Sequence, residues 1–300
     1  MDDRPLSILH SLPVSPRDEQ WGIVCTTAGH QHVPPGTPYP VSEHPEHYLF
    51  YKGSGRTLDE YQLVYITAGR GRFESASCPS QTVEAGTMLL LFPNEWHSYS
   101  PDPGTGWTEW WVGFRGANID RLEQQGFLCR RRPLLRIGCS GGIERCYREI
   151  IGTVEEERVG FQPLISSIVL HILGSVLFKH SNLLYSDNPV VEKINRAKAI
   201  MRTDFGRNRS PEQIAREVGM GYTWFRRVFR EYVGMAPAQY QHTMRLNKAR
   251  ELLATTAHSI SEIAYALGFE SVSAFSLFFR LRERLSPSQY RARFRGGKGQ

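Results

Sequence analysis

The sequence predicts an α+β protein of two domains: an antiparallel β-barrel or sandwich, then an all-α domain with two helix-turn-helix units. Short β-prone runs punctuated by glycine occupy the first half of the chain. An internal repeat with an offset of 49 or 50 residues occupies the second half. The charge also changes sign, because residues 1–188 hold 16 Lys/Arg against 21 Asp/Glu and residues 189–300 hold 20 against 9. The second half is therefore expected to meet a polyanion.

The β-prone runs lie in the middle of the first half. Residues 61–66 form one run, which ends in a predicted turn at 68–71. Residues 82–86 and 88–93 are predicted to be two strands around a glycine turn, and 107–114 another. This spacing favours an antiparallel sandwich or barrel.

Two helical patterns follow, at 143–158 and at about 163–184. The second has apolar residues at helical spacing: Ile165, Ile168, Val169, Ile172, Val176 and Leu183. Such a face fits a helix that covers the β domain or a helix-helix dimer seam, and one helix can do both. A polar, proline-ending stretch at 185–189 coincides with the charge reversal. We therefore predict domains at 1–140 and 189–300, with a helical dimerisation segment and linker at 141–188.

Composition and targeting features predict a cytoplasmic protein. The N-terminus lacks the cationic and apolar regions of a secretory signal. The longest apolar stretch, 164–178, is shorter than the ~20 residues of a membrane-spanning helix. Five cysteines without tight spacing are typical of reduced thiols, and none has the sequence setting of a reactive, low-pKa thiol.

The repeat is the most informative feature. Segment 213–219 matches 262–268 at an offset of 49. Further matches at an offset of 50 pair Phe225, Phe229, Pro237 and Tyr240 with Phe275, Phe279, Pro287 and Tyr290. One residue is therefore inserted in the second unit, in its turn.

Each copy has the signals of a short helix followed by a tight turn. Ser210 and Pro211 are expected to cap and start the first short helix, and Ser259 to start the second. Gly219 and Gly268 are expected to end them in a left-handed turn. A short helix, a glycine turn and a second helix with a basic outer face form the helix-turn-helix plan.

Two such units in the most basic part of the chain indicate DNA binding more strongly than one. A single unit often serves packing alone. A helix predicted over 240–253 would join the units rigidly. It would hold both second helices on one face of a duplex, about 34 Å apart, in successive major grooves.

Residues of about 190–293 resemble the DNA-binding region of AraC/XylS-type transcription regulators. The run IAYALGFES at 263–271, continued by Phe275-Ser276, Phe279, Ser286-Pro287 and Tyr290-Arg291, follows the family signature. The resemblance implies a homeodomain-like fold with a tandem helix-turn-helix. It also implies promoter DNA as the partner.

Carried over by position, the resemblance implies these base-facing residues: Thr223, Arg226, Arg227, Val272, Ser273, Ser276 and Leu277. Arginine can bond guanine O6 and N7 bidentately, whereas Val272 and Leu277 can read only thymine methyl groups. The family often has arginine at the position of Leu277 and usually has glycine at that of Arg284. Local packing is the alternative role of Leu277. We therefore predict that the first unit carries most of the sequence discrimination.

Four flanking cations are expected to contact phosphates: Arg230, Arg245, Lys248 and Arg280. Long cations beside a recognition surface usually set position and salt dependence rather than sequence. The alternative for each is an ordinary solvated charge.

Residues 61–114 resemble the cupin-like antiparallel β-barrel that precedes this DNA-binding region in sugar-responsive members. The likeness lies in the segments 65–71, 85–93, 97–99 and 107–114. Positions that match sugar contacts are His97, Tyr99 and Trp111, and Glu109 offers a further hydrogen bond. Trp110 and Trp111 should point to opposite sides of their strand, with Trp111 inside. Filling of the core is the alternative role of these side chains.

The sequence therefore predicts a bacterial, non-enzymatic transcription regulator that responds to a small carbohydrate and needs no cofactor. By resemblance it is an activator, a homodimer and a partner of RNA polymerase. The alternative is a metal-dependent cupin enzyme acting on a small sugar, with the basic half serving another role. His30 and His32 are a ligand-like pair, but no glutamate follows closely and His97 stands alone.

Overall fold

The computed structural model describes residues 7–39, 55–183 and 189–295. The chain divides into two compact units, Met1–Ser186 (unit 1) and Asp187–Gln300 (unit 2). This division lies beside the boundary that the sequence predicts between residues 188 and 189. Each unit is described by itself.

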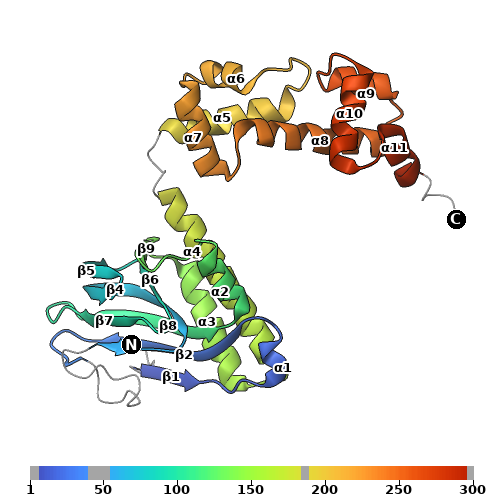
Figure 1. Cartoon of the computed structure of the whole chain (residues 1–300). Helices are drawn as coiled ribbons and strands as arrows, with labels where there is room; N and C mark the ends of the chain where they lie inside the picture. Colours follow the sequence, from blue (N-terminus) through green and yellow to red (C-terminus); the bar gives the residue numbers. More distant parts are fainter. Residues whose placement is uncertain (1–6, 40–54, 184–188, 296–300) are drawn as a thin grey trace. The chain divides into compact units, whose positions relative to one another are not determined.

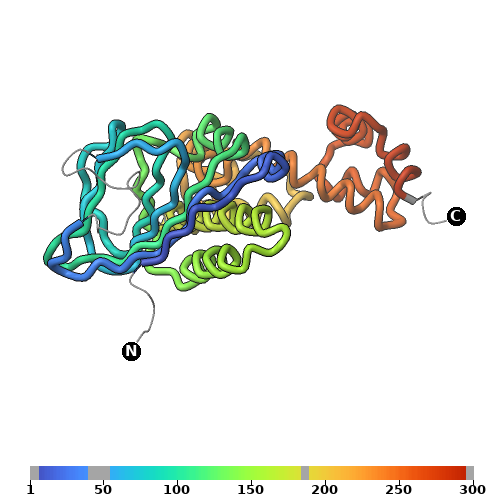
Figure 2. The backbone as a smooth tube through the Cα atoms, turned by 90° about the horizontal axis from the view of Figure 1, so that it is seen from below, coloured from blue at the N-terminus to red at the C-terminus, as the bar shows by residue number. Residues whose placement is uncertain are grey.

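Unit 1 is an antiparallel β structure covered by two long helices (Figures 1 and 2). Its strands are β1 Ser7–Ser11, β2 Val24–Val33, β3 Arg56–Thr57, β4 Tyr61–Ser75, β5 Cys78–Glu84, β6 Thr87–Leu91, β7 Trp96–Pro101, β8 Trp107–Arg115 and β9 Leu134–Arg136. Its helices are α1 Pro16–Glu19, α2 Ala117–Gln124, α3 Gly141–Glu156 and α4 Phe161–Leu183. The main sheet runs β1-β2-β8-β4-β6-β9, and β4 also pairs with β5 and β7. The strands curl into a barrel that does not close, which confirms the predicted fold class (Figure 2).

Strand β4 joins two parts of the sheet. Its first part, from Tyr61 to Ile66, pairs with β6 and β8, and its second part pairs with β5 and β7. The register shifts between Ile66 and Ala68, and Gly69 has a φ of 77°. The predicted turn at 68–71 is therefore wrong. The strand continues through a bulge, which bends it and lets it serve both parts.

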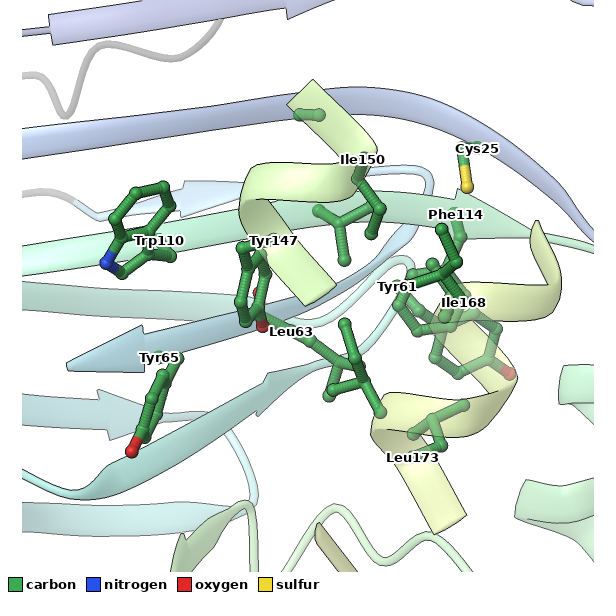
Figure 3. Close-up of a cluster of buried hydrophobic side chains, with 14 of the residues drawn as sticks. Cys25, Tyr61, Leu63, Tyr65, Trp110, Phe114, Tyr147, Ile150, Ile168 and Leu173 are labelled. Atoms are coloured by element: carbon green, nitrogen blue, oxygen red, sulfur yellow. The ribbon is translucent and has the colours of Figure 1, made fainter. Parts of the chain in front are cut away.

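The sheet buries side chains on both of its faces. Trp110 and Tyr147 belong to the core between the strands and helices α3 and α4 (Figure 3). Trp107 and Trp111 belong to a second core, on the inner side of the barrel, with Phe73. The predicted opposite orientation of Trp110 and Trp111 is confirmed, because side chains alternate along a strand.

Helix α4 packs on the sheet through the apolar residues that the sequence singled out. All of them except the exposed Leu183 are buried in the first core. The Gln162 side chain also bonds the backbone N and O of Cys25, at 3.1 and 2.9 Å. The helix has 23 residues, so by length and composition alone it would suffice to cross a membrane, which the shorter stretch 164–178 did not indicate. Its apolar side chains divide between the unit 1 core and solvent, because Leu164, Leu170, Phe178 and Leu183 remain exposed.

Unit 2 is entirely helical in its described part (Figure 1). The helices are α5 Pro189–Thr203, α6 Pro211–Glu217, α7 Tyr222–Val233, α8 Pro237–Thr255, α9 Ile260–Ala266, α10 Val272–Glu283 and α11 Pro287–Arg295. One small core forms around Phe225 and Phe229, and another around Phe275 and Phe279. Helix α8 contributes to both cores. The predicted tandem helix-turn-helix is confirmed.

The turns of the two units show why the helices begin and end where they do. Ser210 and Ser259 cap α6 and α9 in reciprocal capping boxes. Gly219 and Gly268 have φ values of 68° and 76°, which favour glycine. The inserted residue lengthens the second turn. There the Ser271 hydroxyl accepts a bond from the Ala274 amide at 3.1 Å.

Candidate functional site

The outer face of α7 combines exposed cations with a polar side chain. Thr223, Arg226 and Arg227 are all exposed. Phe225 and Phe229 point the other way and are fully buried. The helix is thus held by its aromatic side and presents its basic side to solvent. This is the arrangement that a helix in the major groove needs.

The outer face of α10 is less polar. Ser273 is exposed and Leu277 is 61% exposed, so local packing does not account for this leucine. Ser276 is half-buried. Val272 is also half-buried and packs against the second core, which leaves less of it for a base contact. Arg284 ends the helix in a left-handed conformation, at a φ of 59°.

The four predicted phosphate contacts separate into different groups. Arg230 and Arg280 are exposed, as such a role requires. Lys248 is half-buried and forms an ion pair with Glu251 at 2.7 Å.

Arg245 does not fit the prediction of phosphate contact. It is only 9% exposed, and burial lowers the pKa of its guanidinium. Its Nη2 donates to Asn208 Oδ1 at 2.5 Å, and the guanidinium lies 5.8 Å from the centre of the Phe269 ring. Arg245 therefore connects the loop before α6 to the turn between α9 and α10.

A second cluster lies on the inner side of the unit 1 barrel. Strand β7 supplies His97 and Tyr99, whose rings stack with centroids 6.2 Å apart. Strand β8 supplies Trp107, Glu109 and Trp111 from alternate positions, so all three share one face. The Trp107 ring lies 5.8 Å from that of Tyr99. The four predicted effector-binding residues thus belong to β7 and β8, two of the strands that line this side.

Arg56, on β3, organises the cluster. Its Nη2 donates to the Tyr99 hydroxyl at 2.8 Å, and its Nε donates to His97 Nε2 at 3.3 Å. The other ring nitrogen of His97 lies 3.1 Å from the carbonyl of Glu95. Burial, and then the charge of Arg56, lower the pKa of His97 to about 4. His97 is therefore neutral and uses both ring nitrogens within the protein, which differs from the predicted direct contact with a ligand.

Two buried polar atoms near this cluster lack hydrogen-bond partners among the described residues. They are Glu109 Oε2 and Trp107 Nε1. Burial raises the pKa of Glu109 to about 8, although the charge of Arg56 acts in the opposite direction. An acceptor and a donor left unpaired in a core are costly unless something else pairs with them.

The histidine pair from the sequence analysis does not join this cluster. His30 is buried on the helix-facing side, with its ring centroid 4.0 Å from that of Trp110. His32 is exposed, and its Nδ1 lies 2.8 Å from Thr108 Oγ1. Within residues 7–39, 55–183 and 189–295, no three His, Cys, Asp or Glu side chains are grouped as metal ligands.

One cysteine departs from the sequence-based expectation. Burial alone would raise the pKa of Cys129, but hydrogen bonds from the Arg131 backbone and from Arg132 outweigh it and lower the pKa overall. The signal for this setting was the run of three arginines that follows Cys129. The lowered pKa of Cys129 thus differs from the other thiols with a shifted pKa, Cys25, Cys78 and Cys146, whose pKa is raised.

Comparison with known proteins matches both units. Residues 47–173 match the model of the AraC-like ligand binding domain, and residues 214–293 match that of a helix-turn-helix domain. The raffinose operon transcriptional regulatory protein RafR of Pediococcus pentosaceus is 24% identical over 80% of this chain and 87% of its own. The transcriptional activator RhaS of Salmonella paratyphi B is 26% identical over 78% of this chain and 85% of its own.

A solved structure is similar to part of this chain. It is a transcriptional regulator with an AraC-type DNA-binding domain from Chromobacterium violaceum, 32% identical over 36% of this chain and 96% of that one, with a TM-score of 0.32.

A ligand-binding barrel followed by tandem helix-turn-helix units defines a class of DNA-binding transcription regulators. The two family models together span most of the chain, and this chain belongs to the AraC family.

Proposed function

We propose that this regulator binds promoter DNA through α7 and α10 and changes its DNA occupancy when a small carbohydrate binds inside the unit 1 barrel. The observation that carries the proposal is the basic outer face of α7, repeated in position by α10. Helix α8, which joins the two helix-turn-helix units, has 19 residues and is therefore about 28 Å long. This is close to the ~34 Å between successive major grooves on one face of a duplex.

The base-reading set that the geometry supports is a subset of the predicted one. Thr223, Arg226 and Arg227 would read bases from α7, and Ser273 and Leu277 from α10. Ser276 would contribute at the edge of this face. Arg230 and Arg280 would contact phosphates, which position the helices without reading sequence.

The barrel cluster suits a neutral, hydroxyl-rich effector. Glu109 Oε2 would accept from a sugar hydroxyl and Trp107 Nε1 would donate to one. The rings of Trp107 and Trp111 offer apolar surface for the C–H side of a sugar. Tyr99 and His97 would act by holding Arg56 in place. The name of the raffinose operon relative agrees with a sugar effector.

A thermal-shift panel of mono- and oligosaccharides tests the effector class. A ligand that binds only the folded protein raises the unfolding free energy by about 2.7 kcal/mol at 100 times its Kd. The shift should be much smaller in Glu109→Gln and should persist in Trp110→Phe, because Trp110 lies on the other face of the same strand. A panel in which no saccharide shifts the melting temperature would contradict the proposal for unit 1.

Effector affinity should also depend on pH. The Glu109 pKa of about 8 means that the effector-free protein is mostly protonated there at neutral pH. Hydroxyl donors favour the carboxylate, so binding releases a proton and affinity rises as pH rises from about 6 to 8. Glu109→Gln should bind weakly and without this dependence. Calorimetry across this pH range measures both.

The homodimer would use the side of α4 that the unit 1 core leaves exposed. Residues at alternating spacings of three and four lie on this side: Leu164, Ser167, His171, Gly174 and Phe178. This spacing is that of a coiled-coil seam. Phe178→Glu should therefore convert a dimer to a monomer in sedimentation experiments, whereas a wild-type monomer would contradict the seam.

Activation through contact with RNA polymerase completes the proposal. The name of the relative RhaS, a transcriptional activator, supports this part of the proposal. The regulator would act in the bacterial cytoplasm, where its DNA lies. Transcription from a bound promoter in a purified system, with and without the effector, distinguishes activation from repression.

A further inference from the structure

The outer face of α10 carries a row of apolar side chains that remain open to solvent. Leu277 and Leu281 are 61% and 72% exposed, and Ala274 is exposed as well. Spacings of three and four residues place these side chains next to one another along a helix. Phe275 and Phe279 are fully buried on the inward side. The row is therefore surface that the second core does not need.

The exposed charges on α10 and its C-cap have one sign, although the exposed Glu270 lies in the turn before the helix. The exposed charged residues of α10 and its C-cap are Arg280, Arg282 and Arg284. Glu283 has a side chain only 12% exposed, and Arg250 holds it at 2.5 Å. An apolar row among cations complements a polyanion that also presents apolar groups. The major groove of DNA does so, because the C5 methyl of each thymine projects into it.

The equivalent row on α7 has different chemistry. An offset of 50 residues pairs Ala274, Leu277 and Leu281 with Trp224, Arg227 and Glu231. The first unit therefore presents hydrogen-bonding and charged groups where the second presents only carbon. A leucine cannot distinguish bases by hydrogen bonds, but it can distinguish thymine from the other bases by contact with the methyl group.

We infer that the Ala274–Leu277–Leu281 row reads thymine methyl groups, so that the half-site of the second unit is selected by apolar contact. The inference rests on the proposed placement of α10 in the major groove. It adds Ala274 and Leu281 to the reading surface. Each contacted methyl should contribute about fourfold in affinity, the effect of burying one methylene-sized group.

Replacement of thymine by 2′-deoxyuridine tests this directly, because the pairing stays the same and only the methyl is lost. Duplexes are first selected from a randomised pool with the full-length protein. Each thymine of a selected site is then replaced singly, and Kd is measured by fluorescence anisotropy. We expect at least one replacement in one half-site to weaken wild-type binding about fourfold. The penalty should disappear in Leu277→Ala or Leu281→Ala.

Ser273→Ala is the matched control, because it changes the same outer face without removing apolar surface. It should retain the full deoxyuridine penalty. Both leucines are largely exposed, so their alanine variants should melt at the wild-type temperature.

Three results would overturn the inference. If every thymine of the selected sites tolerates deoxyuridine, the inference falls, although specific DNA binding stands. A penalty equal in wild type and in both leucine variants would assign the methyl contact to other residues. Leucine variants that change the oligomeric state, but not the deoxyuridine penalty, would make the row a contact between copies. A pool without enriched sequences would instead overturn the proposed function, and the inference with it.

Discussion

The two helix-turn-helix units have the same internal packing. In the first, the Phe229 and Tyr240 rings meet edge-on with centroids 5.5 Å apart. In the second, Phe279 and Tyr290 meet in the same way at 5.3 Å. These contacts attach the recognition helices, α7 and α10, to the helices that follow them, α8 and α11. The aromatic residues that repeat in the sequence therefore form the shared buried frame that holds each helix-turn-helix unit together.

The outer faces of the same helices differ. Arg226 and Arg227 on α7 correspond to Ser276 and Leu277 on α10. The buried frame is shared while the exposed chemistry has diverged, which teaches that the fold and the base preference of such a unit are set by different residues. The first unit is built for hydrogen bonds to bases, and the second for apolar contact.

Among the substitutions that test this difference between α7 and α10, Arg227→Ala should cause the largest loss of DNA affinity. Loss of a bidentate arginine–guanine contact costs about 1–3 kcal/mol, or roughly 5- to 150-fold in Kd, and relaxes specificity at that base pair. Leu277→Ala should cost only a few-fold. Anisotropy on the selected duplex and on randomised DNA measures both. A greater loss of specificity in the leucine variant would contradict the division of roles.

Arg245→Ala should destabilise the protein rather than weaken its phosphate contacts. Its removal takes away a 9% exposed side chain that packs over the Phe269 ring and donates to Asn208 Oδ1, which costs about 0.5–3 kcal/mol of unfolding free energy. Urea unfolding of the full-length protein measures this cost. The salt dependence of DNA binding should stay at the wild-type slope. An unchanged stability with a reduced slope would restore the phosphate role.

Arg230→Ala and Arg280→Ala should have equal effects, because the two residues occupy equivalent positions. Each lost phosphate contact should reduce the slope of log K against log salt by about 0.9. Titrations between about 50 and 200 mM salt give this slope. Lys248→Ala is the comparison variant, with a smaller expected change because Glu251 already pairs with this lysine. Unequal slopes for the two arginines would indicate that only one unit lies on the backbone.

Substitutions at the C-caps of α7 and α10 should have the smallest effect, a small change in the free energy of unfolding. Gly234 and Arg284 are equivalent, and both have positive φ values, 80° and 59°. Arg284→Gly should stabilise the protein by about 0.5 kcal/mol, because the left-handed conformation strains a side chain. Gly234→Ala should destabilise it by about 1 kcal/mol. Thermal unfolding measures both, and shifts of the same sign would contradict the equivalence.

Much of unit 2 could be predicted because its signals are local. Ser210 and Ser259 indicate the starts of helices, and Gly219 and Gly268 indicate turns. Each of these residues lies next to the element that it caps or ends. The exposure of Leu277 could not be predicted, because the same residue type also serves cores. The burial of Arg245 could not be predicted, because the side chains that it contacts, Asn208 and Phe269, are distant from it in the sequence.

Unit 1 was predicted less completely because its contacts are long-range. Strand β2 was missed since its Ala, Gly, His and Gln residues carry little β signal, yet it lies between β1 and β8 and pairs with both. The bulge between Ile66 and Ala68 resembled a turn because Gly69, which follows it, has a positive φ and glycine serves both structures. Arg56 was missed because it lies on a two-residue strand, 41 residues before His97.

Hydroxyl-radical footprinting of the full-length protein on a selected duplex tests the central claim most directly, that both recognition helices enter one duplex. We predict two protected segments about one helical turn apart on the same face of the DNA, both weakened by salt. Arg227→Ala should reduce protection chiefly in one segment, and Leu277→Ala chiefly in the other. A single protected segment, or two that respond equally to both substitutions, would contradict the claim.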